Sequence, residues 1–259
     1  MAIVTARWWR LLSWVATANV GIWLLIWWLT PVGNPYVASQ LALSGIYVVV
    51  CAYRSFYPRI DLERRVLVDS HLSSILLGRS AATIAEICFG IQLGLLLYLL
   101  GDYAGLPWVQ QAAWVVPICT AAAQVFCWHS ILTLNHIGQA VEEFFWAVGM
   151  SWLAALLAVV AHATQGPVQY LAIGGILASL AFTAYVLVVD IPMYIRRFRR
   201  HRARGRRYLC VRDGLRDAWC RREEDTRWEK WRDDAAWLTP YFTLGVWFSL
   251  GLVLVPGAL

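Results

Sequence analysis

The sequence predicts an all-α integral membrane protein, folded as a bundle of about seven transmembrane helices. Of its 259 residues, 60% are hydrophobic and only 15% are charged, whereas roughly 25% of the residues in a soluble domain are charged. Several apolar runs reach the roughly 20 residues that a helix needs to cross about 30 Å of hydrocarbon. Many of the 16 Trp residues stand near the ends of these runs, where the indole ring favours the headgroup boundary.

Seven apolar segments are predicted to cross the membrane. Their hydrophobic runs cover residues 8–30, 36–53, 80–100, 107–133, 144–163, 168–195 and 237–256. The first run is too long for a signal peptide and has no small-residue cleavage site, so we interpret it as an uncleaved span. Three connections are short and rich in Gly and Pro, which is typical of tight turns: residues 31–35, 101–107 and 164–167.

The distribution of arginine predicts the orientation of the bundle. Basic residues occur before the first span, between the second and third spans, and after Ile195. Because cytoplasmic connections carry an excess of Lys and Arg, the N-terminus is expected inside and the C-terminus outside. The arginine-rich composition and the lack of organelle signals favour a bacterial inner membrane as the location of this multi-pass protein.

We expect residues 1–259 to form a single polytopic membrane domain, with residues 196–236 as a basic cytoplasmic loop between helices six and seven. This loop holds 15 of the 22 Lys and Arg residues, 8 of the 16 Asp and Glu residues, and Trp219, Trp228 and Trp231. The composition is typical of a segment at an anionic headgroup layer, which makes membrane lipids the expected partners. Nucleic acid is not expected, because acidic residues interleave with the basic ones and no recognition fold is present.

A second surface segment is expected before the third span. Residues 66–79 are too polar to form a separate crossing, so we predict that they lie at the interface and lead into the helix.

Glu86 is the charge with the least structural justification in the sequence. It stands about seven residues inside the third predicted span, where a charged side chain costs roughly 2.5 to 3.5 kcal/mol on insertion scales. A carboxyl group at that depth is suited to proton transfer. Arg79 lies on nearly the same helical face but about 10 Å away along the axis, so a direct pair is not expected. Arg79 either binds an anionic headgroup or extends toward the cytoplasm.

The connection between helices four and five is polar but carries no Lys or Arg. It offers His129, Asn135, His136, Gln139, Glu142 and Glu143. The orientation rule does not explain these residues, since the other inside connections are basic. A functional site is one explanation. The alternative is that Glu142 and Glu143 balance the positive N-terminus of the next helix.

Asp190 completes the candidate site, near the cytoplasmic end of helix six. An aspartate paired with the arginines that follow it is the alternative explanation. Six acid or base candidates come from helices three to six and are expected in the same leaflet: Glu86, His129, His136, Glu142, Glu143 and Asp190. Arg79, Asn135 and Gln139 are the candidate substrate-binding residues.

No cofactor is indicated by the sequence. His129, His136 and Glu143 recur every seven residues, which separates successive side chains by about 10 Å on a straight helix. Zinc ligands on one helix are normally three or four residues apart. A metal ion would therefore need one ligand from each of several helices. The six cysteines contain no CxxC pair, so no disulfide framework or zinc knuckle is expected.

The sequence favours an intramembrane enzyme that acts on a lipid or another hydrophobic substrate, with acid and base groups below the cytoplasmic surface. The alternatives are a small proton-coupled transporter, in which Glu86 and the histidines change protonation, and a non-catalytic subunit of a larger membrane complex. The single lysine, Lys230, lies in the basic loop, which excludes a retinal Schiff base inside the bundle.

Overall fold

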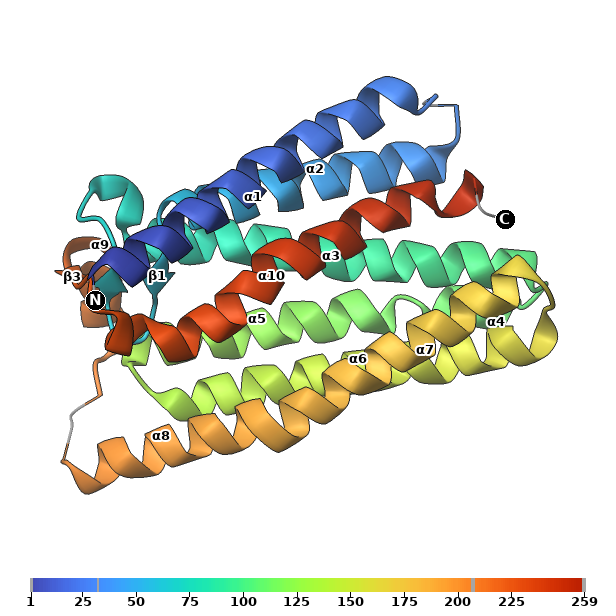
Figure 1. Ribbon diagram of the computed structural model, residues 1–259. Helices are drawn as coiled ribbons and strands as arrows, with labels where there is room; N and C mark the ends of the chain where they lie inside the picture. Colours follow the sequence, from blue (N-terminus) through green and yellow to red (C-terminus); the bar gives the residue numbers. More distant parts are fainter. Residues whose placement is uncertain (1, 32, 206–207, 258–259) are drawn as a thin grey trace. The chain divides into compact units, whose positions relative to one another are not determined.

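The computed structural model describes residues 2–31, 33–205 and 208–257 and consists mainly of helices (Figure 1). The helices are α1 (Ala2–Leu29), α2 (Pro35–Phe56), α3 (Ile75–Tyr103), α4 (Pro107–Ala112), α5 (Val115–Thr133), α6 (His136–Ala163), α7 (Pro167–Tyr185), α8 (Ile191–Ala203), α9 (Val211–Cys220) and α10 (Trp228–Leu254). Short 3-10 turns cover η1 (His71–Ser73) and η3 (Val255–Gly257), and η2 (Val186–Asp190) is a π-helix.

Seven helical segments within the described ranges are long and apolar enough to cross a membrane. They cover Ile3–Leu29, Pro35–Phe56, Ile75–Tyr103, Pro107–Thr133, His136–Ala163, Pro167–Ala203 and Trp228–Gly257. The predicted class of a polytopic all-α membrane protein with about seven spans is therefore confirmed. The inside or outside location of the two termini remains a prediction.

The helices begin where proline and asparagine stand in the sequence. Asn34 caps α2 by accepting a hydrogen bond from the Tyr36 amide at 2.8 Å, with Pro35 in the first turn. Gly166 has φ +70°, a left-handed conformation that glycine adopts readily, and Pro167 then starts α7. The connections before α2 and α7 are therefore short turns that contain Pro, Gly or Asn, as the sequence predicts.

The chain folds as two compact units. The first unit contains residues 1–89 and 212–254, and so includes α1, α2, the first half of α3 and α10. Trp8 of α1 contacts the ring of Trp231, whereas Tyr36 of α2 donates a hydrogen bond to the Leu252 carbonyl near the other end of α10. Helices α1 and α10 therefore run parallel to each other, and α2 runs antiparallel to both.

A small polar cap lies at one end of the first unit. Three two-residue strands, β1 (Arg59–Ile60), β2 (Arg65–Val66) and β3 (Glu223–Glu224), form a sheet in the order β1-β2-β3. The first pair is antiparallel and the second is parallel. Hence the connection before α3 and the connection before α10, far apart in sequence, share one sheet.

Side chains strengthen this cap. Arg64 Nε lies 2.7 Å from Asp217 Oδ2 of α9, and Arg222 Nε lies 2.7 Å from Asp69 Oδ1. The Asp225 amide donates to the Val66 carbonyl at 3.1 Å. Hydrogen bonds from Arg227 lower the pKa of Asp225 to about 2, so this carboxylate stays charged at neutral pH.

The predicted basic segment at 196–236 contains regular structure. Helix six continues through α8 to Ala203, and the remainder contains α9, β3 and the start of α10. Asp217 of this segment pairs with Arg64 of the connection before α3, and the location of the segment at the headgroup layer remains a prediction. Arg206 and Arg207 of the segment lie outside the described residues. Residues 66–79 run from the last residue of β2 through η1 into the first turn of α3 and so lead into the third helix; their place at the membrane interface remains a prediction.

The second unit contains residues 90–211 and 255–259. Within it, α5 and α6 pack through the stacked rings of Phe126 and Phe145, whose centroids are 5.3 Å apart. Close helix contacts depend on small residues: a Cβ added to Gly90 would lie 2.6 Å from Thr120 Oγ1, and one on Gly175 would lie 2.7 Å from Leu157 Cδ1. The π-helix η2 interrupts the long segment from α7 to α8.

Native cysteines offer a test of the orientation. Cys210 and Cys220 are exposed, whereas the other four cysteines are buried. If the N-terminus is inside, a membrane-impermeant maleimide will label these two thiols in inside-out vesicles and not in right-side-out vesicles. A Gly33→Cys reporter in a variant lacking both native thiols should show the opposite pattern, since nothing lies within 4 Å of a Cβ at Gly33. Labelling of Cys210 and Cys220 from the outside would reverse the topology.

Candidate functional site

An ion pair joins two of the predicted site residues on α3. Arg79 Nη2 lies 2.8 Å from Glu86 Oε2, and both side chains are less than a tenth exposed. The hydroxyl of Tyr241, on α10, donates to the other carboxylate oxygen, Oε1, at 3.1 Å. Both oxygens of Glu86 are therefore bonded, one to a cation and one to a neutral donor.

The expectation that Arg79 and Glu86 do not pair is wrong. Seven residues of helix separate their Cα atoms by about 10 Å, but the long arginine side chain lies along the helix face and spans most of that distance. Its Nε also bonds Thr83 Oγ1 at 3.4 Å, one turn before Glu86. Arg79 is thus held against α3 instead of extending toward the membrane surface.

Buried polar groups of α2 lie close to this pair. Tyr47 is 3% exposed and packs against Tyr241, with ring centroids 6.2 Å apart. A Cβ added to Gly245 of α10 would lie 2.9 Å from the Tyr47 hydroxyl oxygen, so glycine leaves room for that group. The result is a compact set of polar side chains from α2, α3 and α10 within the first unit.

The last turn of α2 and the connection after it add three more buried arginines. Arg54 is 9% exposed, Arg59 is 2% exposed and Arg64 is 1% exposed. Arg59 donates to the Ser74 carbonyl at 2.7 Å, and its guanidinium lies over the Tyr53 ring at 4.8 Å. Burial, together with the neighbouring charge of Arg54, lowers the pKa of Arg59. Arg54 in turn faces Asp61 at 3.8 Å and the ring of Phe242.

In the second unit, the polar connection between α5 and α6 is a tight turn with its own caps. Leu134 ends α5 in a left-handed conformation, with φ +58°. Asn135 then caps α6, because its side-chain oxygen accepts from the Ile137 amide at 3.2 Å. Asn135 is one of the predicted substrate-binding residues, and its role as the N-cap of α6 is a structural explanation for its presence at this position.

The early start of α6 bears on the two glutamates. Since α6 begins at His136, Glu142 and Glu143 lie about two turns inside the helix, and its first turn holds no acidic residue. The helix dipole acts mainly on the first turn. Balancing the N-terminus therefore does not explain these carboxylates, which leaves the functional explanation standing.

Two histidines meet at the start of α6. The rings of His136 and His201 are in edge contact, with centroids 4.4 Å apart and planes at 74°. His136 is 2% exposed, and His201 comes from the end of α8. One turn further along α6, the Gln139 side-chain amide donates to Glu142 Oε2 at 2.8 Å and to the Cys127 thiol at 3.3 Å.

Three carboxylates of this unit lie near Tyr194 of α8, those of Glu142, Glu143 and Asp190. Arg197 lies near the same tyrosine. Asp190 ends the π-helix η2 and hydrogen-bonds the side chain of Tyr185. A π-helix is rare and occurs frequently at functional sites.

The structure brings the predicted residues together in two groups. One holds Arg79 and Glu86, in the first unit. The other, in the second unit, holds Gln139, Glu142, Glu143 and Asp190, whereas His136 contacts His201. His129 joins neither, because its side chain is exposed on α5. A single cluster of all six acid and base residues remains a prediction, since Glu86 and the others belong to different units.

Sequence reasoning missed several partners of these residues. His201 lies in an arginine-rich stretch for which the sequence predicts a loop. Because no Gly or Pro occurs between Met193 and Arg204, the sequence is compatible with a sixth helix that continues as far as His201. Tyr241 carries no such signal, because its contact with Glu86 spans 155 positions.

No group of three His, Cys, Asp or Glu side chains in residues 2–31, 33–205 and 208–257 is close enough to hold a metal ion. Comparisons of the chain with family models, curated proteins and solved structures found no match. The function is therefore inferred from the site geometry.

Replacing Glu86 by Gln tests the ion pair. The amide keeps the size of the side chain but leaves the Arg79 charge buried without its carboxylate, which costs about 3–5 kcal/mol in comparable buried pairs. We expect a loss of this size in the free energy of unfolding, measured by SDS titration in mixed micelles. The Glu86→Gln/Arg79→Met double variant removes both charges and should recover most of the loss. A single variant as stable as the wild type would show that the pair is not structural.

Gly78 tests the packing of Arg59. A Cβ at Gly78 would lie 1.9 Å from Arg59 Nη1 and 2.3 Å from Cζ, so Gly78→Ala must displace the guanidinium from the Ser74 carbonyl. Losing a buried hydrogen bond of a charged donor should lower unfolding stability by about 1–3 kcal/mol. Gly174→Ala is the matched control, because nothing lies within 4 Å of a Cβ there. Equal melting temperatures of the two variants would contradict this role of Arg59.

Proposed function

We propose that this polytopic membrane protein is an enzyme that acts on a lipid or another hydrophobic substrate, with its acid and base groups at the start of α6. The observation that carries the proposal is the edge contact between the buried ring of His136 and the partly exposed ring of His201. Histidine is the side chain whose unperturbed titration falls nearest to physiological pH.

Two adjacent imidazolium rings repel each other, so a pair in contact is suited to holding one proton and releasing it. In this role His136 accepts a proton from the substrate as general base, and His201 shares the resulting charge. The Glu142 carboxylate lies on the same helix as His136 and is fixed by the 2.8 Å hydrogen bond from Gln139. In this proposal Glu142 stabilises a cationic histidine or, when protonated, donates a proton to a leaving group.

Glu86 and Arg79 enter this proposal as a structural pair. Because Arg79 is bonded to Glu86 and Thr83, it is a poor candidate for the headgroup anchor suggested by its position in the sequence. The exposed end of α8 is better suited to that task. Arg199, Arg200, Arg202 and Arg204 are all exposed, and we propose that they and the following basic segment contact anionic lipid headgroups.

One observation favours the alternative of a proton-coupled carrier. The π-helix η2 places Asp190 at a discontinuity between α7 and α8, and helix interruptions beside a buried carboxylate are features on which transporters depend. In such a carrier Asp190 would change protonation as the helix segments move.

The test is conversion of lipid by the reconstituted protein. Wild-type protein and His136→Gln are incubated in vesicles of mixed polar lipids, and all lipid species are then quantified by mass spectrometry. We expect a lipid product with the wild type and a loss of at least a hundredfold in its rate with His136→Gln, a typical cost of removing a general base. His162→Gln is the control, because His162 lies near the far end of the same helix and is exposed.

Two outcomes would contradict the proposal that the protein is a lipid-converting enzyme. One is a product that forms equally with His136→Gln. The other is an unchanged lipid composition together with proton flux that depends on Asp190, measured with a pH-sensitive dye inside the vesicles. The second result would establish the carrier in its place.

A further inference from the structure

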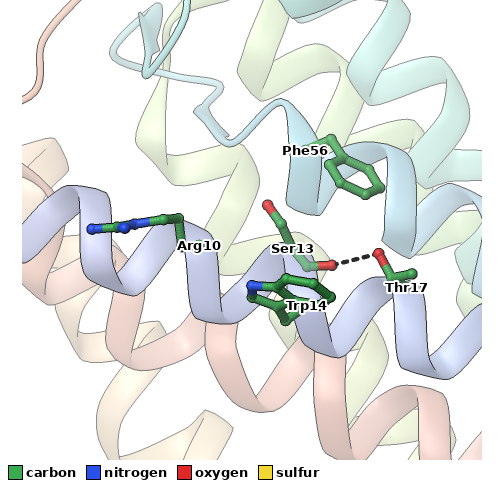
Figure 2. Close-up of a pocket in the computed structure, with 5 residues that line it drawn as sticks. All are labelled: Arg10, Ser13, Trp14, Thr17 and Phe56. Carbon is green, nitrogen blue, oxygen red and sulfur yellow. Dashed lines mark hydrogen bonds between the residues drawn. The ribbon is translucent and has the colours of Figure 1, made fainter.

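A groove of about 230 Å³ lies between α1 and α2, in the first unit. It is lined by Arg10, Ser13, Trp14, Thr17 and Phe56 (Figure 2). The four α1 residues are spaced three, four and seven positions apart, which places them on one face of the helix. The groove follows that face from Arg10 toward Thr17.

The walls of the groove are apolar despite their two hydroxyl residues. Ser13 donates to the Trp9 carbonyl and Thr17 donates to the Ser13 carbonyl, each at 2.9 Å, so both hydroxyls are satisfied within α1. Trp14 and Phe56, on opposite sides of the groove in Figure 2, are 74% and 40% exposed. Such a surface favours hydrocarbon over water.

Arg10 supplies a cation at one end of the groove. Its Nε donates to the Ala6 carbonyl at 3.3 Å, which directs the side chain toward the start of α1 and away from Trp14. None of the ion pairs in the described part of the chain involves Arg10, and its side chain is exposed. An apolar channel that ends at an uncompensated guanidinium is complementary to an anion joined to a hydrocarbon chain.

We propose that this groove binds one anionic glycerophospholipid, with an acyl chain between Trp14 and Phe56 and the phosphate against Arg10. The groove is smaller than pockets for whole drug-sized molecules, which measure roughly 300–1,000 Å³, so it accommodates a segment of one acyl chain, the rest of which lies in the surrounding bilayer. The site is independent of the enzyme proposed above, because it involves none of the α6 residues. It also differs from general adsorption at the basic segment, because it binds one lipid at a defined position.

Native mass spectrometry of the full-length protein in detergent tests the site. Phosphatidylglycerol and phosphatidylcholine with the same acyl chains are titrated separately. We expect one phosphatidylglycerol to be retained, about fivefold more tightly than phosphatidylcholine, as a single basic residue near a lipid phosphate provides. Arg10→Gln should abolish this preference. Arg7→Gln, an exposed arginine on the same helix that does not line the groove, should keep it.

Two further measurements locate the lipid and define its chemistry. Phosphatidylglycerol with a photoreactive acyl chain should cross-link to peptides containing Trp14 or Phe56. Inorganic phosphate should not displace the lipid if the chain is required. A quadruple Gln variant at Arg199, Arg200, Arg202 and Arg204 should retain the single lipid while adsorbing less to anionic vesicles.

The proposal is overturned if Arg10→Gln and Arg7→Gln lose the preference equally, or if the cross-links fall on other helices. Displacement of the lipid by inorganic phosphate would assign the site to a free anion instead. Equal retention of the two phospholipids by the wild-type protein would show that the groove does not select an anionic lipid, which would also contradict the proposal.

Discussion

The ion pair between Arg79 and Glu86 satisfies the strictest constraint on this fold, which is that charges among membrane-spanning helices need partners from the protein itself. Both residues lie on α3, so each charge is neutralised by a partner on the same helix. The hydrogen bond from Tyr241 then connects that pair to α10. Tyr47 of α2 packs against the same tyrosine in the space that Gly245 leaves. Three helices of the first unit are thereby held in one arrangement around a neutralised pair of charges.

The polar groups of the second unit are arranged differently. His136 contacts another histidine, and Glu142 is bonded to the neutral amide of Gln139. Glu86 is bonded to a buried arginine of its own helix, which is the reason for describing it as part of a structural pair. The proposed acid and base roles of the α6 residues depend instead on the contact between the two histidines. The π-helix beside Asp190 adds a point at which the second unit departs from regular helix.

Arginine serves three purposes in this chain. Arg54, Arg59, Arg64 and Arg79 are buried and bonded, although the orientation rule treats all of them simply as markers of the cytoplasmic side. The arginines at the end of α8 are exposed, and in our proposal they contact headgroups. Arg10 stands alone at the end of an apolar groove, where its charge selects an anionic lipid in our proposal. One of the buried arginines also stabilises the cap formed by β1, β2, β3 and α9, because Arg64 forms an ion pair with Asp217 of α9.

The class of the protein, its seven spans and most of their ends follow from the sequence, because hydrocarbon demands long apolar helices and because Pro, Gly and Asn end or cap them locally. Glu86 stands out in the sequence because a charge is costly inside a span, and the stretch from His136 to Glu143 stands out because it is a polar connection without Lys or Arg. The contacts of these residues follow only from the packing of the helices. The bonds from Tyr241 to Glu86 and from Arg64 to Asp217 join positions more than 150 residues apart, and helical periodicity carries no information over that distance. The exposure of His129 and the contact of His136 with His201 likewise depend on how separate helices pack, which local pattern does not encode.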